Sequence, residues 1–211
     1  FVQLYKNMFH FYSFYGNIYK EKGKMYMLRT KDILDEKDPR VRAKNTNIEF
    51  PLNEEYKNII PEMLKHLRYS QIEKLSKKYD LRPGMGLAAP QLGINKNFFV
   101  VCYEVKDGVF DDYILINPKV ISYSEEMIYA GEGEGCLSVN REVEGIVPRH
   151  ARITVEAYDL DGNKHKYRVR EDLAIAFQHE LDHLNGILFV DRINKNNPFE
   201  IVENSTPVKF E

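Results

Sequence analysis

The chain has 211 residues, of which 43% are hydrophobic and 29% charged, and its formal net charge is −2. This length and composition fit one soluble globular domain with enough apolar residues for a core. The charge gives no reason to expect nucleic acid or an anionic membrane as the main partner, and no apolar run is long enough to span a bilayer. The two cysteines, Cys102 and Cys136, are expected to be reduced thiols.

Residues 1–24 differ in composition from the rest, because aromatic side chains crowd together among a few lysines. The chain begins at Phe1 rather than Met, which indicates a trimmed or processed product. The segment is either the remnant of an organelle-targeting presequence or a poorly ordered or surface-packed extension, and composition leaves both open. Residues 25–211 are expected to form a single domain.

The first long helical region is expected at residues 53–80. Asn53 can cap its N-terminus, Pro61 falls in a tolerated early position, and apolar residues recur at helical intervals. The segment from Leu81 to Gly93 then ends the helix, and its glycines allow close backbone approach to a ligand or another strand. The segment is either a plain tight loop or part of a cleft, where the Gln91 amide could donate to an oxygen.

Most of the chain that follows is expected to be strand. Strand signals cover residues 98–103, and residues 113–118 and 119–123 form two strands joined at Asn117–Pro118. Residues 151–158 and 164–170 are expected to pair as a hairpin through an Asp-Gly turn. Short antiparallel strands together with two helical regions predict an α+β fold.

Residues 171–186 are expected to form a buried helix that ends at Gly186, because apolar residues follow two of its faces. His179 and His183 lie one turn apart on the same side, with Glu180 beside them as a potential base. This H-E-x-x-H pattern predicts a metal site, although a histidine pair on the surface is the alternative.

Cys136 lies in a glycine-rich, acidic stretch, which is an unusual setting for a cysteine. It is either a buried structural thiol or the thiolate that supplies the third metal ligand. One cysteine and two histidines would leave a fourth coordination position open, which is typical of catalytic sites.

Three stretches resemble the motifs of peptide deformylases, in order: Gly84-Met-Gly86-Leu-Ala-Ala-Pro-Gln91, Glu134-Gly135-Cys136-Leu137-Ser138 and Gln178-His179-Glu180-Leu-Asp182-His183. The resemblance spans residues 25–191. It implies antiparallel β-sheets wrapped around a central C-terminal helix that carries the histidine motif, together with the long N-terminal helical region. A proline often follows Ser-Val in the family, whereas this chain has Asn140.

The resemblance implies a role for each matching residue. Cys136, His179 and His183 would bind the metal, and Glu180 would be the catalytic acid/base. Gln91 and the backbone N–H of Leu137 would hold the formyl oxygen, and Gly86 would touch the substrate backbone. Three flanking charged residues are expected to support the ligands: Glu134, Arg149 and Asp182. Two helix residues either line the methionine pocket or belong to the ordinary core: Ile175 and Ala176.

The reaction implied is metal-dependent removal of the N-formyl group from the first methionine of nascent polypeptides, at the ribosome, with release of formate. The ligand set alone favours Zn²⁺, whereas the resemblance implies Fe²⁺ as the physiological ion, with Zn²⁺, Ni²⁺ or Co²⁺ in purified protein. No membrane or sequence-specific nucleic-acid partner is expected. The expected location is a plastid or mitochondrion of a eukaryote, and a bacterial cytoplasm is the alternative.

Two other classes of protein share the histidine motif. A zinc peptidase would need an acidic third ligand downstream, for which Glu200 or Glu203 could serve. A zinc-stabilised binding module would have no activity. Little chain follows His183 for the second helix that such a peptidase uses.

Overall fold

The computed structural model describes residues 27–209, so the extension predicted at residues 1–24 lies outside the described residues. The fold is mixed α+β, with three α-helices and eight strands in this part of the chain. The α-helices are α2 (Glu54–Gln71), α3 (Glu73–Tyr79) and α4 (Glu171–Leu184). The strands are β1 (Gly86–Ala88), β2 (Phe98–Lys106), β3 (Val109–Tyr123), β4 (Met127–Ala130), β5 (Arg149–His150), β6 (Arg152–Tyr158), β7 (Lys164–Arg170) and β8 (Ser205–Val208). Short 3-10 helices are η2 (Thr30–Asp32), η3 (Pro39–Arg42), η4 (Ala89–Leu92) and η5 (Phe189–Asp191).

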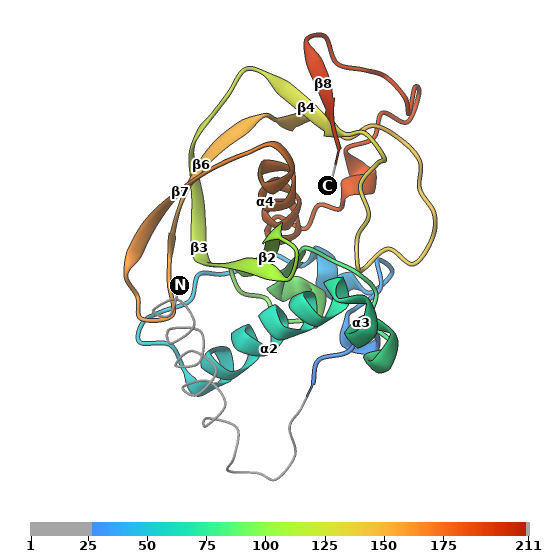
Figure 1. The fold of residues 1–211 in the computed structure, drawn as a ribbon. Helices are drawn as coiled ribbons and strands as arrows, with labels where there is room; N and C mark the ends of the chain where they lie inside the picture. The colour runs from blue at the N-terminus through green and yellow to red at the C-terminus, as the bar shows by residue number, and fades with distance from the viewer. Residues whose placement is uncertain (1–26, 210–211) are drawn as a thin grey trace.

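A five-stranded antiparallel sheet, in the order β1-β2-β3-β6-β7, curves around α4, and α2 packs on its other face (Figure 1). Strand β2 explains this layering, because successive side chains point to opposite faces. Phe98 and Val100 pack in the cluster that includes α2, whereas Phe99 and Val101 pack with Phe177 of α4. All four β2 residues are fully buried, as expected of a strand covered on both faces.

The second sheet, in the order β5-β4-β8, includes a parallel pair that differs from the expected antiparallel pattern. Strand β8 runs parallel to β4, with Met127 opposite Ser205 and Ala130 opposite Val208. A hairpin can join only antiparallel neighbours, so a parallel pair requires a long connection. Here the whole of β5 to α4 separates the two strands, and the tail after α4 returns to the edge of β4.

Two expected boundaries were wrong. Residues 113–123 belong to one strand, β3, in which Asn117 and Pro118 form a bulge rather than a joint. Asn117 has a φ of +51°, and its side-chain amide pairs with the backbone N–H and C=O of Ile48 at 2.8 Å each. A bulge also accommodates Pro118, which has no N–H to donate to the ladder. The helical region 53–80 is interrupted at Ile72 and forms two helices.

Other local predictions were confirmed. The Asn53 side chain caps α2 by accepting from the Tyr56 N–H at 3.0 Å, and β6 and β7 pair as an antiparallel hairpin. Helix α4 ends before Gly186, which has a φ of +71° and whose N–H donates to the His183 carbonyl at 3.1 Å. None of the helices between residues 27 and 209 combines the length and the apolar character that crossing a bilayer requires.

Candidate active site

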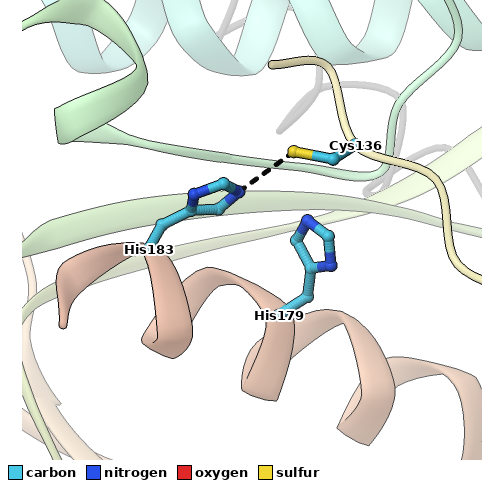
Figure 2. Close-up of side chains that lie close together, drawn as sticks. All are labelled: Cys136, His179 and His183. Carbon is cyan, nitrogen blue, oxygen red and sulfur yellow. Dashed lines mark hydrogen bonds between the residues drawn. The ribbon is translucent and has the colours of Figure 1, made fainter. Parts of the chain in front are cut away.

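Three potential metal ligands converge at the centre of the fold. His179 and His183 project from the same side of α4 toward Cys136, which lies in the loop between β4 and β5 (Figure 2). The Cys136 Sγ lies 3.2 Å from the His183 Nε2, and one donor atom from each residue lies within 4.8 Å of the others. One sulfur and two imidazole nitrogens suit borderline-soft ions such as Zn²⁺ and Fe²⁺.

The His179 ring is oriented by a buried chain of charges. Its Nδ1 lies 2.8 Å from a Glu134 carboxylate oxygen, and since a carboxylate can only accept, Nδ1 carries the proton and Nε2 is free to face the metal position. Arg149, 3% exposed, donates to both oxygens of Glu134 at 2.8 and 2.9 Å and to Asp182 at 2.6 Å. Burial disfavours the Glu134 carboxylate, but the bonds from Arg149 outweigh that cost and hold its pKa at about 2.

Glu180 lies beside the cluster in a buried and crowded position. Burial raises the pKa of its carboxyl to about 7, although a cation bound at the cluster would lower that pKa again. Gly86 of β1 packs directly against this carboxyl, because a Cβ at Gly86 would lie 2.3 Å from the Glu180 Oε1. Gly86 is therefore needed for space beside Glu180, a reason that the sequence alone did not indicate.

Two buried polar atoms at the cluster have no hydrogen-bond partner within the described part of the chain. They are the Glu180 Oε2 and the His183 Nδ1. Leaving such atoms unpaired costs free energy, so the cluster is suited to a further polar occupant. Together with the donor set, the unpaired Glu180 Oε2 makes the cluster fit a divalent ion and a water molecule, whereas the His183 Nδ1 lies on the side of its ring away from the Cys136 Sγ.

An open cavity of about 280 Å³ lies over the cluster. Its lining includes most of the residues predicted for the site: Gly86, Gln91, Glu134, Cys136, Leu137, Ile175, Ala176, His179 and Glu180. Ile175 and Ala176 are 2% and 9% exposed, so they are buried side chains that reach the cavity wall. A larger and open depression between β3, β6 and the arm before α2 contains none of these residues.

The Gln91 amide is held in one orientation. Its Oε1 accepts from the Ala88 N–H at 2.8 Å, and its Nε2 donates to the Ser138 Oγ at 3.2 Å and lies 3.7 Å from the Cys136 Sγ. The donor side of the amide therefore faces the cluster. The Leu137 N–H has no acceptor within residues 27–209.

The structure adds residues that sequence reasoning missed. Arg192, beyond α4, donates to Asp182 at 2.9 Å and so shares that carboxylate with Arg149. No local motif marks Arg192, because the contact depends on how the tail folds back. Glu200 and Glu203, the acidic ligands that a peptidase would need, are exposed in the tail and do not join the donor cluster.

Comparisons with known proteins show the family of this chain. The family model described as polypeptide deformylase matches residues 30–199. A peptide deformylase of Oceanobacillus iheyensis is 48% identical over 183 residues, which are 87% of this chain and the full length of that protein, and peptide deformylase 2 of Bacillus anthracis is 47% identical with the same coverage.

Solved structures give the same result. Peptide deformylase 1B of Arabidopsis thaliana superposes with a TM-score of 0.64 at 33% identity, covering 78% of this chain and 82% of that one. The peptide deformylase of Thermotoga maritima superposes with a TM-score of 0.62 at 32% identity. The match covers 81% of this chain and 99% of that one. The chain therefore belongs to the polypeptide deformylase family, metal-dependent hydrolases that remove the N-formyl group from nascent polypeptides.

Proposed function

We propose that this chain hydrolyses the formyl group of N-terminal formyl-methionine with one divalent ion held by Cys136, His179 and His183. The observation that carries the proposal is the convergence of a cysteine thiol from a loop with the two histidines of α4 beside an open cavity. A divalent ion bound there would act as a Lewis acid and lower the pKa of water.

Glu180 is the group that moves protons. Its carboxyl lies next to His179 and lines the cavity, with one oxygen unpaired. The carboxylate takes a proton from the attacking water and later passes one to the leaving amine. The water oxygen bonds to the formyl carbon, the carbon–nitrogen bond breaks, and the leaving nitrogen takes the proton that Glu180 held. Formic acid then loses its own proton, so the products are formate and the free α-amino group.

The Leu137 N–H and the Gln91 amide stabilise the charge that develops on the formyl oxygen. Both residues line the cavity; the N–H is fixed by the backbone, and the amide is held by Ser138 before substrate arrives. Donors placed in advance need no reorganisation during the reaction, and a single donor is typically worth about 3 to 4 kcal/mol.

The methionine side chain is accommodated beside Ile175 and Ala176. These residues lie one turn before His179 on α4 and give the cavity an apolar wall. The absence of a side chain at Gly86 leaves room for the Glu180 carboxyl beside β1. Met85, also on the lining, extends the apolar surface.

We further propose Fe²⁺ as the ion in the cell, with Zn²⁺ replacing it during aerobic purification. A thiolate with two imidazoles suits either ion, and an exposed iron–thiolate site is sensitive to oxidation. Purification without oxygen should yield iron and higher activity, whereas zinc under both conditions would contradict this assignment.

The substrates are formylated nascent chains at the ribosome, in a bacterial cytoplasm or a eukaryotic organelle of bacterial descent. The bacterial relatives at 47–48% identity support a bacterial-type enzyme. Fusing residues 1–24 to a fluorescent reporter tests the organelle hypothesis, because a targeting segment would carry the reporter into the organelle.

The activity is tested by measuring formate released from formyl-Met-Ala-Ser, alongside cleavage of the unformylated peptide. We expect formate and intact Met-Ala-Ser. Peptide-bond cleavage would favour a zinc peptidase, and inactivity on both substrates by the metal-loaded protein would favour a binding module.

A further inference from the structure

The peptide group between Cys136 and Leu137 has its carbonyl oxygen bonded within the protein and its N–H without a protein acceptor among residues 27–209. Peptide bonds are planar and trans here, so the Leu137 N–H points away from the Cys136 carbonyl. The carbonyl oxygen accepts from the Val139 N–H at 3.1 Å and from the Arg82 guanidinium. The N–H is left without a protein acceptor in the described residues, on the residue that lines the cavity.

Arg82 is held firmly behind this peptide group. Its guanidinium also donates to the Asn140 Oδ1 at 2.7 Å, and its backbone N–H donates to the Thr30 Oγ1 at 3.0 Å. The Asn140 amide in turn donates to Asp35 at 2.7 Å. Arg82 is half-buried and is not among the residues that line the cavity, so it contacts the back of the loop.

A cation that bonds to a carbonyl oxygen pulls electron density from the whole amide. Hydrogen bonds to charged donors are stronger than neutral ones, and successive hydrogen bonds polarise one another. The Leu137 N–H consequently becomes a stronger donor, and the plane of its peptide is fixed.

We propose that Arg82 is a positioning residue for the reaction: through the Cys136 carbonyl it orients and polarises the Leu137 N–H that receives the charge of the formyl oxygen. This inference rests on the proposed function. The Asn140 side chain, which follows the loop motif in this chain, completes the partners of the guanidinium.

The kinetic test compares Arg82→Met, which keeps the aliphatic stem without a donor, with Arg82→Lys and with Arg141→Met. Arg141 is a matched control because it lies on the same loop but pairs with Glu36 at 2.7 Å. We expect Arg82→Met to lower kcat about tenfold, less than the roughly 10²- to 10³-fold cost of deleting such a donor, with little change in KM. Lysine should restore part of kcat, and Arg141→Met should change neither constant.

A spectroscopic test reports on the same peptide group without activity. Protein carrying ¹³C-carbonyl cysteine and ¹⁵N-leucine gives one Cys–Leu amide signal, because Cys102 precedes tyrosine and only Cys136 precedes leucine. In the zinc-loaded form, Arg82→Met should move the Cys136 carbonyl and the Leu137 amide proton to higher field. Arg141→Met should leave both in place, and metal content should be equal in all samples.

An unchanged signal, an unchanged kcat or an equal loss in Arg141→Met would each overturn the proposal. If Arg82→Met does not fold, Arg82→Gln takes its place, since it keeps an N–H donor without the charge. A moved signal with unaltered kcat would then show that the polarised amide does not contribute to the rate, which overturns the positioning role. If the wild type releases no formate, the proposed function fails, while the signal still decides whether Arg82 polarises this amide.

Discussion

The Gly86 Cα and the Glu180 carboxyl are so close that a Cβ at position 86 would lie 2.3 Å from Oε1 and 2.7 Å from the carboxyl carbon. Real Cβ contacts are essentially never this short, so a side chain at Gly86 would have to displace Glu180. The contact joins β1 to α4 at the point where the proposed proton carrier faces the cavity. The glycine motif and the histidine motif are therefore coupled sterically, because the Glu180 carboxyl fits only where position 86 has no side chain.

Gly86→Ala should therefore lower kcat by at least about tenfold, because misplacing an acid/base forfeits part of the roughly 10²- to 10⁴-fold that such a group contributes. The measurement is formate release with metal content determined on the same samples. Gly135→Ala is the matched control, since its Cβ would meet no atom within 4 Å, and it should lose much less activity. Equal effects of the two substitutions would contradict the steric argument.

Cys136→Ala and Glu180→Gln should separate metal binding from proton transfer. The cysteine variant loses one of three protein ligands, so it should purify with little metal and little activity. The glutamine variant keeps the ligands and the shape of Glu180, so it should keep the metal and lose roughly 10²- to 10⁴-fold in kcat. Full metal occupancy in Cys136→Ala would remove the basis of the proposed site.

Local sequence signals predicted the parts of the fold that depend on interactions between residues close in the chain. The apolar faces of α4, its stop at Gly186 and the Asp-Gly hairpin between β6 and β7 all depend on residues close in the chain. The spacing of His179 and His183 placed both rings on one side of a helix. The unusual setting of Cys136 made it a candidate third ligand, and the resemblance to the family chose between that role and a structural thiol, although Cys136 is more than forty residues away.

Long-range pairing was not predictable in the same way. Strand β8 contains Pro207 and two hydroxyl residues, so it has little intrinsic strand signal, and its parallel partner β4 is far away in the chain. The bulge at Asn117 depends on Ile48, and the second cation on Asp182 comes from Arg192. Each of these contacts forms only when the tertiary fold places two distant segments side by side. The sequence of either segment alone therefore does not predict the contact.

Arg149→Met should destabilise the protein and weaken metal binding together. Removing the buried guanidinium leaves Glu134 and Asp182 facing each other without this partner, and breaking a buried ion pair typically costs about 3 to 5 kcal/mol. Losing the group that fixes a ligand's orientation typically lowers metal affinity about 10- to 100-fold. Arg152→Met, which breaks an exposed pair with Glu126, is the control and should change stability by less than about 1 kcal/mol. Unchanged metal affinity and rate in Arg149→Met would rule out its supporting role.

His66 should make the protein less stable in mild acid, independently of the active site. The side chain is fully buried in α2, with Nδ1 3.0 Å from the Leu28 carbonyl and Nε2 unpartnered among residues 27–209. Burial lowers the pKa of the imidazole below 6.5, although the bond to Leu28 and the charge of Asp32 oppose the shift. The unfolded chain then binds a proton more readily than the folded protein, so stability is present above pH 6.5 and declines as pH falls below it.

Urea unfolding of the wild type and of His66→Gln at pH 7 and pH 5 measures this contribution. The free energy of unfolding of the wild type should fall more than that of the variant, by at most about 1.4 kcal/mol per pH unit for one proton. Both proteins keep the ligand histidines of α4, so acid-dependent metal loss affects them equally and the difference isolates His66. A larger acid-induced loss in His66→Gln than in the wild type would mean that the imidazole is protonated in the folded state.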